Sequence, residues 1–317
     1  MINLVWIITD LTVAAGPADV WWLWAGMPSR AEGGLWSTSL ADPLLLCVHA
    51  AAGVAAMRSA SAAGALVSAA AVTLALRSPV LWMLQADWMR IVDEELRTQA
   101  TLTAGAGVVL GAALLVVVAV GRRPVDGAAG ADGAARVLPV RPGPTASVIV
   151  FLLLAAASGT GAAWQVHWAR EWGRRTYGSL LTGDGPQNVY GLLQPPYGWL
   201  SWTIIGLGLV GAVAALCRAT FSRPLGMTAA AMLLAWGLAA VSVHQRTDAF
   251  RDFGDLPVRE QLSAATALFE TLAGIAVLWV LARCGERPGA EPYEGAYSHD
   301  GIGVHSPPPP SPPPPGW

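Results

Sequence analysis

The chain contains no lysine, and all nineteen of its basic residues are arginine. A retinal or pyridoxal Schiff base, a phosphate-loop lysine and a lysine general base each need a primary amine that can lose its proton. All three chemistries are therefore excluded.

Charge of either sign is also scarce. Charged residues make up 13% of the chain and apolar residues 54%, whereas an ordinary soluble domain carries about 25% charged residues. Several Ala-, Val- and Leu-rich stretches approach the length of about 20 residues that crosses a bilayer. The composition predicts a multi-pass membrane protein in contact with lipid, and the net charge of −2 does not favour nucleic acid as a partner.

Catalytic and metal-binding motifs are missing as well. The three cysteines form no C-x-x-C pair. The chain has no H-E-x-x-H, no G-x-S-x-G and no G-x-x-x-x-G-K sequence, which removes the common zinc protease, serine hydrolase and ATPase signatures. We assign no catalytic residue, metal ligand or cofactor, and the question of enzymatic activity stays open, with a non-enzyme favoured.

Hydropathy windows of about 19 residues predict seven transmembrane helices. An eighth candidate, residues 3–25, has the right length but contains Asp10, Pro17 and Asp19. A cleaved signal peptide is the alternative, although this segment lacks a basic start and a small-residue cleavage site. We expect an all-α integral membrane protein with about eight transmembrane helices, or seven if residues 3–25 do not span. The seven clear windows are 38–57, 61–78, 101–120, 146–164, 199–217, 225–243 and 262–283.

Short sequence matches suggest an internal repeat. Arg-Thr-Gln at 97–99 is echoed by Arg-Glu-Gln at 259–261, and Gly-Arg-Arg-Pro at 121–124 by Gly-Glu-Arg-Pro at 285–288. The matches predict two parallel four-helix halves, 1–120 and 146–283, although chance similarity between Ala- and Leu-rich segments is the alternative. Weaker matches pair Trp24-Ala25 with Trp168-Ala169, and residues 35–38 with 200–203.

Two segments outside the predicted helices have a low-complexity composition. Residues 121–145 are rich in Ala, Gly and Pro, and predict a disordered cytoplasmic linker. Residues 284–317 predict a disordered cytoplasmic tail that ends in two runs of four prolines. Residues 306–317 would suit an aromatic-lined groove on a protein partner, and a solvated tail is the alternative.

The arginines hardly indicate which way the chain is oriented in the membrane, because nine fall on one predicted face and ten on the other. The tryptophans are divided less evenly between the two faces, and tryptophan in a membrane protein usually lies in a belt at the membrane–water interface. We assign the tryptophan-rich face to the outside of the cell membrane and the C-terminus to the cytoplasm. The tryptophans on that face are Trp21, Trp22, Trp24, Trp36, Trp82, Trp88, Trp164, Trp168, Trp172, Trp199 and Trp202.

Five ionisable residues lie at or near membrane depth, where such groups are costly and often functional. They are Asp10, Asp19, Asp42, His49 and Glu270, and together they form a candidate polar path. Glu270 lies deepest within a predicted span. Because a carboxyl group away from water is more stable when protonated, Glu270 would suit the loading and release of a proton. A neutral carboxyl group that only joins two helices is the alternative.

Asp42 and His49 are seven residues apart and so lie on one face of a helix. Pro43 directly follows Asp42, and proline favours the first turn of a helix. Asp42 is therefore also a candidate helix cap, and His49 is a candidate for an ordinary interior histidine.

Three arginines near Trp168 and Trp172 form a candidate anion site on the outer face. Arg170, Arg174 and Arg175 would suit a phosphate headgroup.

Three functions follow from the sequence. A transporter or permease for a small solute, or a proton-coupled process, is favoured. The alternatives are a non-catalytic subunit or scaffold, and an enzyme acting on a lipid or envelope precursor.

Overall fold

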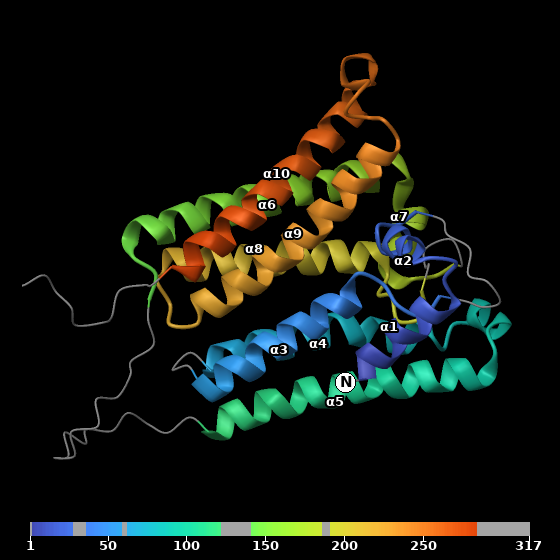
Figure 1. Cartoon of the computed structure of the whole chain (residues 1–317), viewed down its shortest axis with the longest axis horizontal. Coiled ribbons are helices and arrows are strands. Elements are labelled where there is room, and N and C mark those ends of the chain that lie inside the picture. The colour runs from blue at the N-terminus through green and yellow to red at the C-terminus, as the bar shows by residue number, and fades with distance from the viewer. Residues whose placement is uncertain (1, 28–35, 59–61, 122–140, 186–190, 284–317) are drawn as a thin grey trace, which may run out of the picture.

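The computed structural model describes residues 2–27, 36–58, 62–121, 141–185 and 191–283. Most of the predicted linker, the whole predicted tail and the candidate partner segment 306–317 lie outside the described residues. The described chain is helical (Figure 1). Its elements are α1 (Ile2–Val13), α2 (Pro17–Trp24), α3 (Ala41–Arg58), α4 (Ala62–Met83), η1 (Asp87–Ile91), α5 (Glu94–Gly121), α6 (Pro144–Glu171), α7 (Gly173–Thr182), α8 (Tyr197–Leu216), α9 (Ser222–Arg246), η3 (Phe253–Asp255) and α10 (Val258–Ala282).

Six of these helices, α4, α5, α6, α8, α9 and α10, are long and apolar enough to cross a membrane. Their outward surfaces carry large apolar side chains such as Leu102, Val117 and Leu272, which are 68%, 61% and 64% exposed. Exposed apolar surface of this extent is disfavoured in water and suits lipid. The chain is therefore a multi-pass helical membrane protein.

The first predicted span, residues 3–25, is not one straight helix. It forms α1 and α2, which are bent by 120° relative to each other. Proline removes a helix hydrogen bond and is disfavoured in a helix interior, and Pro17 starts α2 after an extended Gly16. The pair counts as one broken span or as a re-entrant loop, so the described residues hold six spans, or up to seven with this pair.

The predicted span at 38–57 begins later than expected, because residues 36–40 are not helical and α3 starts at Ala41. The apolar part of α3, Ala41–Met57, is shorter than the six long helices. A non-helical segment inside a membrane protein must find hydrogen-bond partners within the protein. The partners of residues 36–40 are described with the candidate site below.

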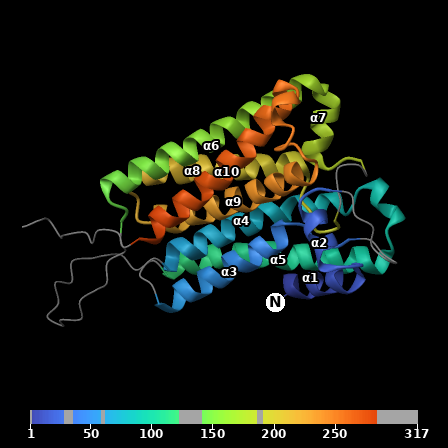
Figure 2. The ribbon, with the colours of Figure 1, turned by 45° about the horizontal axis from the view of Figure 1, so that its top comes forward.

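The two sequence halves form neighbouring helix groups (Figures 1 and 2). In the first half α4 packs against α3 and α5, and in the second half α9 packs against α8 and α10. The halves meet in an apolar core that includes Leu76 from α4, Leu200 from α8 and Met232 from α9. Trp199 strengthens this contact, because its indole Nε1 donates a hydrogen bond to the carbonyl oxygen of Ala75 at 2.7 Å.

Glycines allow the closest helix contacts in each half. A Cβ atom on Gly111 of α5 would lie 2.9 Å from Leu74 Cγ and 3.3 Å from the Ala70 carbonyl oxygen on α4. A Cβ atom on Gly274 of α10 would lie 2.8 Å from the backbone nitrogen of Leu234 on α9. The sequence Gly107–Gly111 is a G-x-x-x-G motif of the kind that lets membrane helices approach, and both of its glycines face α4.

The glycine contact between α4 and α5 predicts that replacement of glycine by alanine on α5 destabilises the protein at one position and not at another. We expect Gly111→Ala to lower the free energy of unfolding by about 1–3 kcal/mol, because the new methyl group overpacks the helix contact. The matched control is Gly105→Ala on the same helix, where an added Cβ has no atom within 4 Å. Unfolding in mixed micelles measures both variants, and equal stability of the two would contradict this account.

Candidate functional sites in the two halves

An ion pair lies buried in the first half, between Arg77 of α4 and Asp42 of α3. Arg77 is 1% exposed and Asp42 is 0% exposed. The guanidinium group also donates to the Leu193 carbonyl oxygen at 2.9 Å and to the Asn3 side-chain oxygen at 3.1 Å. These bonds tie α1, α3, α4 and the segment before α8 to one cation, and removal of that cation would leave several buried acceptors without a donor.

The two buried aspartates satisfy the non-helical segment that precedes α3. Asp10 accepts hydrogen bonds from the backbone N–H groups of Ser37 at 3.0 Å and Thr38 at 2.7 Å, and from the Thr38 hydroxyl group. Asp42 accepts the Ser39 N–H at 2.8 Å. Three consecutive backbone donors thus end on carboxylates, which removes the cost of burying them unpaired.

Asp42 acts as a helix cap in the manner of a capping box. The Ser39 hydroxyl oxygen accepts the Ala41 N–H at 3.3 Å, while Asp42 accepts the Ser39 N–H in return. In this arrangement the residue at the helix boundary is Ser39, and Asp42 lies three positions further on. The same carboxylate therefore both caps α3 and pairs with Arg77.

A second non-helical segment, residues 191–196 before α8, pairs with the first. The backbone N–H groups of Leu192 and Leu193 donate to the carbonyl oxygens of Trp36 and Ser37 at 3.1 and 2.8 Å. The backbones approach so closely that a Cβ atom on Gly191 would lie 2.5 Å from the Thr38 carbonyl oxygen. The first half and the second half are joined at this point by main-chain hydrogen bonds.

His49 lies on the same side of α3 as Asp42, as its spacing predicts, and contacts α4. Its Nδ1 atom is 2.7 Å from the Leu45 carbonyl oxygen and its Nε2 atom is 3.1 Å from the Thr73 hydroxyl group. His49 and Arg77 line one cavity of about 320 Å³, which we call the first-half cavity. Its walls are Ile2, Asn3, Leu45, Leu46, His49, Thr73, Arg77, Thr103, Ala106, Gly107 and Leu110.

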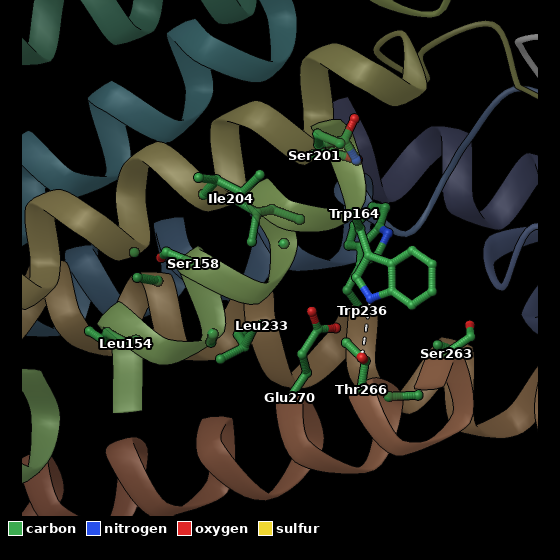
Figure 3. A pocket seen from close by; sticks show the side chains of 18 of the residues that line it. Leu154, Ser158, Trp164, Ser201, Ile204, Leu233, Trp236, Ser263, Thr266 and Glu270 are labelled. Atoms are coloured by element: carbon green, nitrogen blue, oxygen red, sulfur yellow. Dashed lines mark hydrogen bonds between the residues drawn. The ribbon is translucent and has the colours of Figure 1, made fainter. Parts of the chain in front are cut away.

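Glu270 lies elsewhere, near the middle of α10, in a cavity of about 220 Å³ between α6, α8, α9 and α10. We call it the second-half cavity. Figure 3 shows the Glu270 carboxyl group turned from α10 into this space, on the side where Trp164 and Trp236 lie. Ser158, Gln165, Ser201, Ser263 and Thr266 add polar atoms to the walls.

Aromatic residues form much of the second-half cavity. Trp164, Trp168, Tyr197 and Trp236 all line it. Trp164 is held in place because its Nε1 donates to the Thr266 hydroxyl oxygen at 3.1 Å (Figure 3). Within the described residues, no hydrogen bond or ion pair reaches the carboxyl group of Glu270.

The five residues of the predicted polar path thus fall into separate places. Asp10 and Asp42 contact residues 37–39, and His49 lines the first-half cavity beside Arg77. Glu270 lies in the second-half cavity. Asp19 is in the first turn of α2 and lines neither cavity.

The three arginines of the predicted anion site lie where α6 turns into α7, and their side chains are exposed. Beside them, Trp168 stacks on Trp172 with ring centroids 4.5 Å apart. The same corner holds an ion pair at 3.1 Å between Arg259 and Glu171. Anion binding by Arg170, Arg174 and Arg175 stays a prediction.

Arg77 is the important residue that the sequence reasoning missed. The predicted span ended at residue 78, which placed Arg77 at the membrane boundary, but α4 continues through Pro79 to Met83. The apolar sequence Val80-Leu81-Trp82-Met83 after Pro79 is the signal for the longer helix. Trp164 and Trp168, attributed to the interfacial belt, also line the second-half cavity.

Comparisons with protein-family models, curated proteins and solved structures find no match for this chain.

The Arg77–Asp42 pair predicts strong coupling between the two residues. We expect Arg77→Met to lower the free energy of unfolding by about 3–5 kcal/mol, because it leaves a buried carboxylate without its cation. The double variant Arg77→Met with Asp42→Asn should lose less than the sum of the two single variants. Chemical unfolding of all four proteins measures the coupling energy, and strict additivity would show that the pair does not interact.

Proposed function

We propose that this protein is a transporter or permease for a small solute, and that the second-half cavity with Glu270 is its solute site. The observation that carries the proposal is a carboxyl group without a protein partner in a cavity near the middle of a membrane-spanning helix. An ionisable group in that position is costly, and a functional role is the usual reason for it.

A further cavity extends the site toward the contact between the halves. A space of about 330 Å³ shares Tyr197, Trp236 and Ala240 with the second-half cavity, and its other walls include Ser39 and Leu40. This further cavity therefore adjoins both the Glu270 cavity and the segment that Asp10 and Asp42 hold in place. This arrangement supports a solute path that runs between the two halves, where many transporters place their substrate.

We also propose that the two halves are copies of one four-helix unit. Matching contacts support this. Trp6 Nε1 donates to the Thr103 hydroxyl oxygen at 3.0 Å, as Trp164 Nε1 does to that of Thr266. The close contact of Gly111 with Leu74 is matched by that of Gly274 with Leu234. These contacts align Trp164 with Trp6, whereas the sequence matches placed Trp24 opposite Trp168.

The transport proposal predicts uptake that depends on Glu270. Proteoliposomes that contain the full chain are given labelled benzylguanidinium, benzylurea or benzenesulfonate under an imposed pH gradient. We expect at least one of these solutes to enter faster than into protein-free liposomes, and Glu270→Gln to abolish that uptake because it removes the ionisable group.

The matched control is Glu260→Gln, the same substitution at an exposed position in the first turn of α10, and it should keep wild-type uptake. Transport is contradicted if no solute enters faster than into protein-free liposomes. Uptake that is unchanged by Glu270→Gln would remove Glu270 from the mechanism.

A further inference from the structure

The first-half and second-half cavities occupy corresponding places in the two helix groups. The helix pairs α3 and α8, α4 and α9, and α5 and α10 make equivalent contacts within their halves. The glycine contacts above fix the register: Leu74 matches Leu234, and Gly111 matches Gly274. In that register, wall residues of one cavity match wall residues of the other: Leu45 with Ile205, Thr73 with Leu233, Thr103 with Thr266, and Gly107 with Glu270.

The charges in the two cavities are opposite in sign. In the first half a cation, Arg77, lies against Gly107, and a Cβ atom on that glycine would be 3.0 Å from Arg77 Cγ. In the second half the position of Arg77 is held by Gly237, and the position of Gly107 is held by Glu270. The first half thus carries a buried cation beside Gly107, whereas the second half has an acid at the position of Gly107 and no cation at the position of Arg77.

No cation from the described part of the chain lines the cavity that holds this acid. Among the described residues that line its cavity, Glu270 is the only Asp or Glu and there is no Arg or His. A longer side chain from position 237 has no room, because even a Cβ atom there would lie 2.7 Å from the backbone nitrogen of Thr271. A carboxylate at membrane depth without a cation is costly, so a cation that enters the cavity from outside would supply the positive charge that Arg77 supplies in the first half.

The walls of the second-half cavity also suit a cation. Aromatic ring faces attract positive charge, and Trp is the strongest of them. Trp164, Trp236 and Tyr197 line the same cavity as Glu270. The volume of about 220 Å³ is below the roughly 300–1,000 Å³ of sites for drug-sized ligands, which restricts the ligand to a small molecule.

We propose that the second-half cavity binds a small organic monocation of the guanidinium or alkylamine type. Its charge lies against the Glu270 carboxylate, and its apolar body packs on Trp164 and Trp236. This inference rests on the proposed function, because it names the class of solute that the same site takes.

The test compares two probes of nearly identical shape in equilibrium binding to the full chain in nanodiscs. Benzylguanidinium carries the positive charge, and benzylurea is its neutral counterpart. We expect the wild-type protein to bind benzylguanidinium at least about tenfold more tightly than benzylurea, since a hydrogen bond to a charged group contributes enough free energy for a tenfold change in affinity. Glu270→Gln should remove this preference.

Two further variants keep the test independent of folding. Glu270→Asp retains the charge and should keep a preference for benzylguanidinium, and Glu260→Gln on the same helix should keep the wild-type ratio. Because the measured quantity is the ratio of two affinities for one protein sample, a partly unfolded preparation does not change it. Equal affinities in the wild type, or a preference that survives Glu270→Gln, would overturn the proposal.

The two tests distinguish a failure of the cation-binding proposal from a failure of the transport proposal. Charge-selective binding without uptake of any solute would leave a cation-binding membrane protein and remove transport. Glu270-dependent uptake of benzylurea or benzenesulfonate, without selective binding of benzylguanidinium, would keep transport and remove the cation as its solute.

Discussion

The buried pair of Arg77 and Asp42 is the interaction on which the rest of the structure depends. Two non-helical segments, 36–40 and 191–196, lie inside a helical membrane protein, where unpaired backbone groups are very costly. Asp42 accepts a backbone N–H from the first segment and Arg77 donates to a carbonyl oxygen of the second. The ion pair therefore neutralises two buried charges and holds both segments, and with them the contact between the two halves of the chain.

The second half differs from the first in its ionisable residues and in their contacts. In the register of the proposed repeat, Gly237 takes the position of Arg77 and Glu270 takes the position of Gly107. Asp10 and Asp42, the buried acids in the described part of the first half, each accept several hydrogen bonds that hold structure together. The other half leaves one acid facing a cavity with aromatic walls. The proposed repeat accounts for both observations as two copies of one unit whose charged residues differ.

The sequence was sufficient to predict the helical membrane class and the position of Glu270 near the middle of a long apolar helix, because both follow from local hydropathy. It offered Asp42 as the N-cap of its helix, whereas in the structure Ser39 holds that position and Asp42 lies in the first turn of α3, where it accepts the Ser39 N–H and pairs with Arg77. The break at Pro17 was visible as a residue that disfavours a continuous helix. Residues 3–25 have the length of one span, but length does not reveal that they form two helices bent at Gly16 and Pro17.

The parts that sequence reasoning missed depend on contacts between distant residues. The role of Arg77 follows from Asn3, Asp42 and Leu193, which are brought together only by the fold. The pairing of residues 36–37 with 192–193 has no periodic pattern, since it consists of main-chain bonds between two short irregular segments. Hydropathy windows average over such positions and cannot reveal which side chains share a cavity.

The central claim is that corresponding cavities of the two halves hold opposite charges: Arg77 in the first is paired within the protein, and Glu270 in the second faces a space for a ligand cation. A cryo-electron microscopy map of the full chain in nanodiscs with benzylguanidinium tests this most directly. The account predicts ligand density against the Glu270 carboxyl group, with Arg77 still paired to Asp42 in the first half. Ligand density in the first-half cavity, or an Arg77 side chain turned away from Asp42, would contradict it.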